Sequence, residues 1–154
     1  MMKDHAGAET RFVAWLSRFA TPGLRWLGLL GLCAAYLQGG WDKALDFTAA
    51  IAEMHHFGLS PAAVFAAAAI TLELGASAMV LAGFYRWLGA LSLMVFTLLS
   101  TFLANRFWDA VGLDRAMSKN AFFEHLGLIG GFLLVAWCDI RERTRQGRRN
   151  SDPG

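Results

Sequence analysis

Charged residues are scarce in this sequence. Asp, Glu, Lys and Arg make up 17% of its 154 residues and hydrophobic residues 56%, whereas an ordinary soluble domain carries about 25% charged residues. This shortage excludes a typical soluble domain and predicts an integral membrane protein. The net charge of only +2 also gives no reason to expect a nucleic-acid partner.

Cysteine and histidine are equally sparse. The two cysteines, Cys33 and Cys138, form no Cys-x-x-Cys motif, and their predicted depths in the membrane differ by roughly 10 Å, too far for a disulfide. Of the four histidines only His125 lies near a hydrophobic run, which argues against a bis-histidine haem and a zinc site. We therefore expect no metal and no intrinsic cofactor.

Four hydrophobic runs have the length of a membrane span. They cover residues 24 to about 44, 61 to about 83, 87–105 and 120–138, each close to the about 20 residues that a helix needs to cross a bilayer. We predict an all-α, four-helix membrane bundle over residues 24–140, with short interfacial helices in the N-terminal segment and in the outer loops. Residues 1–23 are expected to form a cytoplasmic and interfacial segment with a short helix around Phe12 and Phe19, and together with the first span they are expected to act as an uncleaved signal anchor. Residues 141–154 are expected to form a basic, disordered tail.

The distribution of Lys and Arg predicts the orientation. An even number of spans places both termini on one side of the membrane, and ten of the fourteen basic residues fall on that side. The four on the other side are Lys43, Arg106, Arg115 and Lys119. The positive-inside rule then predicts cytoplasmic termini, with the basic tail attracted to anionic lipid headgroups.

Glu73 is the only charged residue in the apolar stretch from Phe57 to Tyr85. A carboxylate at the bilayer centre costs roughly 2.5 to 3.5 kcal/mol on insertion scales, so it needs compensation, and such a residue indicates a functional site. The candidates for compensation are a proton, Lys43, His125 or Thr101. Because Lys43 is expected about 10 Å nearer the surface, we favour a neutral or water-bonded Glu73 over an ion pair.

Other polar residues fall in the outer half of the predicted spans. We expect them to converge on one pocket, although each also has a purely structural explanation, such as a snorkelling lysine or a hydroxyl bonded to its own backbone. The candidate pocket residues are Glu73, Lys43, Gln38, Thr101, Glu124 and His125. Gly31, Ala35 and Gly39, and likewise Gly127 and Gly131, have the small-xxx-small spacing that permits close helix packing.

Several short motifs, in order along the chain, resemble one family. They are Gly40, Lys43 and Phe47; Gly58 and Pro61; Glu73 and Gly75; Arg86 and Leu88; Phe107 and Trp108; and Asn120, Gly130 and Gly131. Together they resemble the DoxX family of small four-helix bacterial inner-membrane proteins over residues 24 to about 138. The loop with His55 and His56, and the pair Glu124 and His125, depart from the family pattern.

The resemblance implies a redox setting. Some relatives look like membrane subunits of thiosulfate:quinone oxidoreductase, or partners of superoxide-detoxifying and thiol-handling enzymes. The first hypothesis is therefore a quinone-linked accessory subunit, in which Glu73, Lys43 and His125 surround a quinone headgroup. The alternative is a non-enzymatic assembly or chaperone module, and ion transport is a weaker third. Expected partners are membrane lipids and redox subunits, with a homo-oligomer left open.

Overall fold

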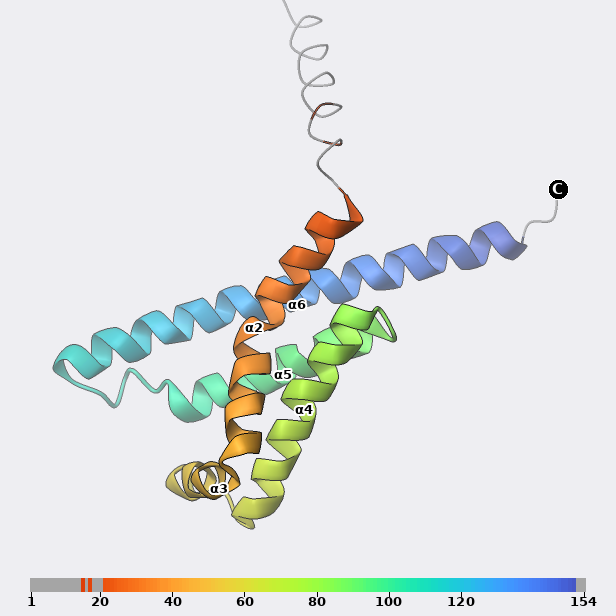
Figure 1. Cartoon of the computed structure of the whole chain (residues 1–154). Coiled ribbons are helices and arrows are strands. Elements are labelled where there is room, and N and C mark those ends of the chain that lie inside the picture. Colours follow the sequence, from red (N-terminus) through yellow and green to blue (C-terminus); the bar gives the residue numbers. More distant parts are fainter. Residues whose placement is uncertain (1–14, 16, 18–20, 152–154) are drawn as a thin grey trace, which may run out of the picture.

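The computed structural model describes Trp15, Ser17 and residues 21–151 of the chain. These residues form five helices, and none of them is in a strand, which confirms the predicted all-α class. The helices are α2 (Pro22–Leu45), α3 (Phe47–His56), α4 (Ala62–Ala82), α5 (Arg86–Ala104) and α6 (Gly112–Ser151) (Figure 1). The interfacial helix expected around Phe12 and Phe19 lies outside the described residues.

Three of the described helices are long and apolar enough to cross a membrane. They are Ala62–Ala82, Arg86–Ala104 and the segment Gly112–Asn150 of α6. The remaining long helix, α2, has 24 residues and coincides with the first predicted span, but Gln38, Asp42 and Lys43 make its C-terminal half more polar. The short helix α3 matches the prediction of short helices in the outer loops.

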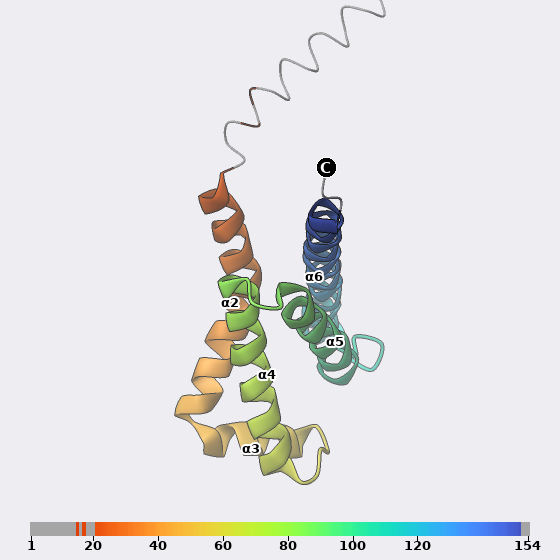
Figure 2. The ribbon, with the colours of Figure 1, turned by 90° about the vertical axis from the view of Figure 1, so that its right-hand side faces the viewer.

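The long helices are arranged as two pairs. Helix α2 packs along α4, and α5 packs along α6, while α4 also packs against α5 and so joins the pairs. Figure 1 shows the α5–α6 pair running across the α2–α4 pair, and the turned view in Figure 2 shows α3 lying across the end of α2 and α4. Contact between α2 and α6 is slight, which leaves these two helices apart along part of their length.

Local sequence explains where the helices begin and end. Thr21 caps α2 by accepting a hydrogen bond from the Leu24 amide, with Pro22 at the first turn, and Asp46 caps α3 through the Ala49 amide. Helix α4 ends at Gly83, whose φ of +78° is a left-handed conformation that glycine adopts without strain. This cap turns the chain directly into α5.

The core lies where all four long helices meet, and small residues bring the backbones together there. Fully buried side chains include Cys33, Val80, Leu93 and Phe132, one from each helix. Gly89 is the tightest point, because a Cβ atom at this position would lie 2.7 Å from the Ala76 carbonyl oxygen.

The predicted small-residue faces are used only in part. Gly39 faces Lys43 and Glu73, and a Cβ atom on Gly131 would lie 3.1 Å from Leu32 Cδ1. Gly31 and Gly127 have no atom within 4 Å of such a Cβ, and so they do not mediate helix packing within this chain.

The structure corrects the expectation of a disordered tail, because α6 stays helical through Ser151. Arg143 bonds Asp139 one turn earlier, with 2.8 Å between Nε and Oδ2, and Thr144 bonds the Ile140 carbonyl. Arg, Glu and Gln are also good helix formers. At 40 residues, α6 is about 60 Å long and exceeds the thickness of a bilayer.

Candidate intramembrane polar site

The centre of the candidate site is an ion pair between Lys43 in the last turn of α2 and Glu73 in the middle of α4. Lys43 Nζ lies 3.2 Å from Glu73 Oε1 and 3.3 Å from Oε2. The two side chains are 18% and 6% exposed, respectively. Glu73 is therefore buried between the helices, and its partner is the more accessible of the two.

This ion pair corrects the expectation of a neutral or water-bonded Glu73. Side chains on a helix lean toward its N-terminus, so Lys43 extends back along α2 toward the level of Glu73 and covers the difference in depth. Gly39 provides the space for it, since a Cβ atom there would lie 3.5 Å from Lys43 Nζ and 3.8 Å from Glu73 Oε2. The missing side chain at Gly39 allows the two charges to meet.

The ion pair leaves donors available for a ligand. An ammonium group has three N–H donors, and the Glu73 carboxylate is the only hydrogen-bond acceptor that Lys43 Nζ contacts among the described residues. Lys43 could therefore donate to an additional oxygen atom, such as a ligand carbonyl, while it still compensates Glu73. The neighbouring carboxylate could hold or release a proton beside that oxygen.

His125 belongs to a second polar group, between α5 and α6. Its Nδ1 atom lies 2.7 Å from Thr101 Oγ1 and 3.2 Å from Asn105 Nδ2. Thr101 Oγ1 also lies 2.6 Å from the Thr97 carbonyl oxygen, which takes the only hydroxyl proton. Nδ1 of His125 then carries a proton and donates it to Thr101, and the Asn105 amide must turn its oxygen rather than Nδ2 toward that N–H; both assignments are made from the hydrogen-bond network.

Tyr36 connects α2 to the buried threonine hydroxyl groups of α5. Its hydroxyl bonds Thr97 Oγ1, and Thr97 Oγ1 in turn donates to the Leu93 carbonyl at 2.6 Å. The tyrosine therefore joins α2 to the threonines of α5 that lead to His125.

The six predicted pocket residues do not form one pocket. Lys43 and Glu73 meet between α2 and α4, and Thr101 and His125 meet between α5 and α6. Gln38 lies on the exposed face of α2, where its amide donates to Asp42 Oδ2 at 2.6 Å, and Glu124 is exposed on α6. Gln38 precedes Gly39 by one residue, about 100° around the helix, and so it points away from Glu73.

Sequence reasoning missed a polar group at the opposite end of the helices, around Asp139. This aspartate is 5% exposed and accepts hydrogen bonds from Arg143 Nε at 2.8 Å and from the Trp87 amide at 3.3 Å. Arg86 Nη1 lies 3.9 Å from Asp139 Oδ1, and Arg86 Nε bonds the Val80 carbonyl at 2.9 Å. The available signal was the four-residue spacing of Asp139 and Arg143.

Comparison with known proteins identifies the family. The sequence model of DoxX matches residues 26–106, slightly more than half of the chain. The chain belongs to the DoxX family. The DoxX match runs from α2 to just beyond α5 and includes both members of the ion pair, whereas His125 and Asp139 lie outside it. Together with the three apolar helices, membership of DoxX makes this an integral membrane protein.

A similar curated protein is the inner membrane protein YphA of Escherichia coli (strain K12). It is 22% identical over 117 residues, which cover 76% of this chain and 84% of YphA. No solved structure matches this DoxX chain.

Proposed function

We propose that this DoxX protein is a quinone-linked accessory subunit of a redox complex, located in the bacterial inner membrane like YphA. The observation that carries the proposal is the buried ion pair of Lys43 and Glu73. An ionisable residue inside a membrane is by default a candidate for a functional site. Here the carboxylate lies at mid-helix, at a depth that a lipid-soluble headgroup can reach.

The chemistry of quinone reduction requires what this pair supplies. A quinone becomes a quinol by taking two electrons and two protons at its two carbonyl oxygens. Lys43 would donate a hydrogen bond to one carbonyl oxygen, Glu73 would take a proton from water and pass it to that oxygen, and the second carbonyl oxygen would take its proton from water directly. The electrons would come from a redox centre of a partner subunit, since quinone chemistry needs an electron donor.

A ligand would reach the pair through Lys43, whose side chain remains partly exposed while Glu73 is buried. His125 belongs to the separate group with Thr101, so the quinone proposal rests on Lys43 and Glu73 and not on the three residues first expected.

The test is to quantify quinone in protein purified in native membrane nanodiscs. Lipid extracts of wild type, Glu73→Gln and Asp42→Asn are compared by mass spectrometry. Asp42 is the matched control, because it neighbours Lys43 in the sequence but bonds Gln38 on the exposed face of α2. We expect stoichiometric quinone in wild type and Asp42→Asn and little in Glu73→Gln. Equal or absent quinone in all three samples overturns the proposal.

The same proposal includes an orientation with both termini in the cytoplasm. The ends of α2 and α6 that carry Arg25, Arg141 and Arg143 lie on the side with ten of the fourteen basic residues, which the positive-inside rule assigns to the cytoplasm. A fluorescent protein fused after Gly154 should fluoresce, as it does only in the cytoplasm. A dark fusion that is present in the membrane contradicts this orientation.

A second candidate function is that of an assembly module without catalysis. It is favoured by Gly28 and Gly31 of α2, where an added Cβ would meet no atom within 4 Å, so that another helix could approach closely. A photo-crosslinking amino acid at position 31 in the native membrane should then capture one reproducible partner. Cross-links to lipid alone contradict this function.

A further inference from the structure

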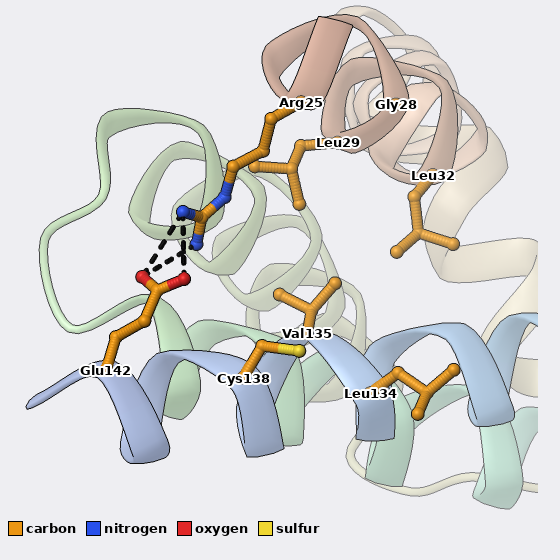
Figure 3. A pocket seen from close by; sticks show the side chains of 8 residues that line it. All are labelled: Arg25, Gly28, Leu29, Leu32, Leu134, Val135, Cys138 and Glu142. Carbon is orange, nitrogen blue, oxygen red and sulfur yellow. Dashed lines mark hydrogen bonds and ion pairs between the residues drawn. The ribbon is translucent and has the colours of Figure 1, made fainter. Parts of the chain in front are cut away.

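Helices α2 and α6 leave a groove between them. Figure 3 shows that Gly28 and Leu32 of α2 form one wall, and that Leu134, Val135 and Cys138 of α6 form the other. The groove encloses about 350 Å³, which is within the range of small-molecule binding sites, about 300 to 1,000 Å³. Its walls are apolar along the two helices.

One end of the groove is closed by an ion pair. Arg25 Nη1 lies 3.1 Å from Glu142 Oε1 and 3.2 Å from Oε2, and Nη2 lies 3.2 Å from Oε2 (Figure 3). The side chains are 45% and 51% exposed. A guanidinium group has five N–H donors, so Arg25 retains donors for a second anion beside Glu142.

The charge around this end is strongly positive. Residues 139–151 of α6 contain five arginines and two acidic residues, Asp139 and Glu142. The N-terminus of α2, at Pro22, lies at the same end of the groove as Arg25, and the N-terminus of a helix carries partial positive charge. An anionic headgroup at this end would therefore face several cations while its chains extend toward the apolar walls.

The membrane itself supplies such a molecule. A groove between two helices in a bilayer is open to lipid, and an unfilled apolar void loses the dispersion contacts of its walls. We propose that the α2–α6 groove binds an anionic phospholipid of the bilayer, with one acyl chain along the groove and its phosphate at Arg25. The ion pair with Glu142 holds the guanidinium in place for the phosphate.

Two variants distinguish binding of the acyl chain in the groove from effects on the packing of the helices. Gly28→Leu adds a side chain that fills the groove, and no atom lies within 4 Å of its Cβ to prevent folding. Gly31→Leu is the matched control, since Gly31 is equally open but does not line the groove. Should Gly28→Leu not fold, Cys138→Phe fills the groove from α6.

A second pair of variants tests the headgroup contact at constant net charge. Arg25→Gln with Glu142→Gln removes one positive and one negative charge at the groove. Arg106→Gln with Asp109→Asn does the same at an exposed pair elsewhere, where both side chains are at least 60% exposed. Because the general attraction of Arg25 and repulsion of Glu142 cancel when both are removed, the first double variant should lose only the hydrogen bond from the guanidinium to the phosphate, about tenfold in anionic preference, and the second should lose none.

The measurement is native mass spectrometry of the full chain released from nanodiscs that contain equal phosphatidylglycerol and phosphatidylcholine. Wild type should retain phosphatidylglycerol preferentially, and Gly28→Leu, unlike Gly31→Leu, should lose it.

Modification of Cys138 by a membrane-permeant maleimide gives a second readout. The reaction should be slower in wild type with phosphatidylglycerol than with phosphatidylcholine alone. Cys138 is exposed and Cys33 is fully buried, so the reaction reports on Cys138. Equal retention of the two lipids overturns the proposal. Oxidative cross-linking of Cys138 between two chains also overturns it, because a second copy then fills the groove.

Discussion

Lys43 and Glu73 form an ion pair within the membrane-spanning part of the protein, with 3.2 Å between Nζ and Oε1, although their Cα atoms belong to different levels of α2 and α4. The lysine reaches across this difference because its side chain leans along α2 toward Gly39. The two members are not equivalent, since Lys43 is partly exposed and Glu73 is buried. This difference leads to the first prediction.

Lys43→Met should destabilise the protein more than Glu73→Gln. Loss of the lysine leaves a buried carboxylate without its partner, and breaking a buried ion pair in this way costs about 3 kcal/mol or more. Loss of the carboxylate leaves a lysine that can turn toward the interface, at a cost of about 1 kcal/mol. Thermal unfolding in detergent measures both variants. The double variant, which combines Lys43→Met with Glu73→Gln, should recover most of the stability lost in Lys43→Met. An equal loss in the two single variants contradicts the prediction.

The helices could be predicted from the sequence because the signals for them are local. Long apolar runs predicted the helices that became α4, α5 and α6, and the order and spacing of several short motifs correctly indicated the DoxX family. The end of α6 was missed because strong net charge was taken as disorder, whereas the bonds of Arg143 and Thr144 to the preceding turn sustain the helix.

The polar site was predicted only in part, because depth in a membrane does not determine lateral position. Glu73 is buried and His125 half-buried, both on expected helices, but α5 and α6 run across α2 and α4, which separates the two. Asp139 was missed for a related reason. Its partner Arg86 is more than fifty positions away, and only the packing of α5 on α6 brings them together.

Gly89→Ala should lower stability by about 1 to 3 kcal/mol, the usual cost of overpacking. The added Cβ would lie 2.7 Å from the Ala76 carbonyl oxygen and 3.0 Å from Met79 Cβ, and a backbone atom cannot move aside without separating α4 from α5. Gly75→Ala is the control, since Gly75 has open space around it and alanine favours a helix by up to about 1 kcal/mol. Comparison of the two melting temperatures checks the prediction, which is wrong if both variants melt like wild type.

Asp139→Asn should be more damaging than Asp109→Asn. Asp139 is buried and receives hydrogen bonds from Arg143 and the Trp87 amide, with Arg86 close by, so the neutral amide would weaken several charge-assisted contacts, each worth about 1.5 kcal/mol or more. Asp109 pairs with Arg106 on the surface at 3.7 Å, where an ion pair contributes about 0 to 1 kcal/mol. Urea or detergent unfolding of the two variants should show this order. A wild-type midpoint for Asp139→Asn would mean that the contacts around it contribute nothing to stability.

Tyr36→Phe isolates the hydrogen bond that joins α2 to α5. The phenyl ring keeps its edge-to-face contact with Phe132, at 5.4 Å between centroids, so the core remains filled and only the hydroxyl contact with Thr97 is lost. Thr97 Oγ1 still donates to the Leu93 carbonyl, which leaves no unpaired donor. We therefore expect a loss of about 1 kcal/mol for Tyr36→Phe, against about 3 kcal/mol or more for Tyr36→Ala, which also opens a cavity. Thermal melts of the two variants distinguish these contributions, because equal losses would place all of the stabilisation in the hydroxyl group and none in the packing of the ring.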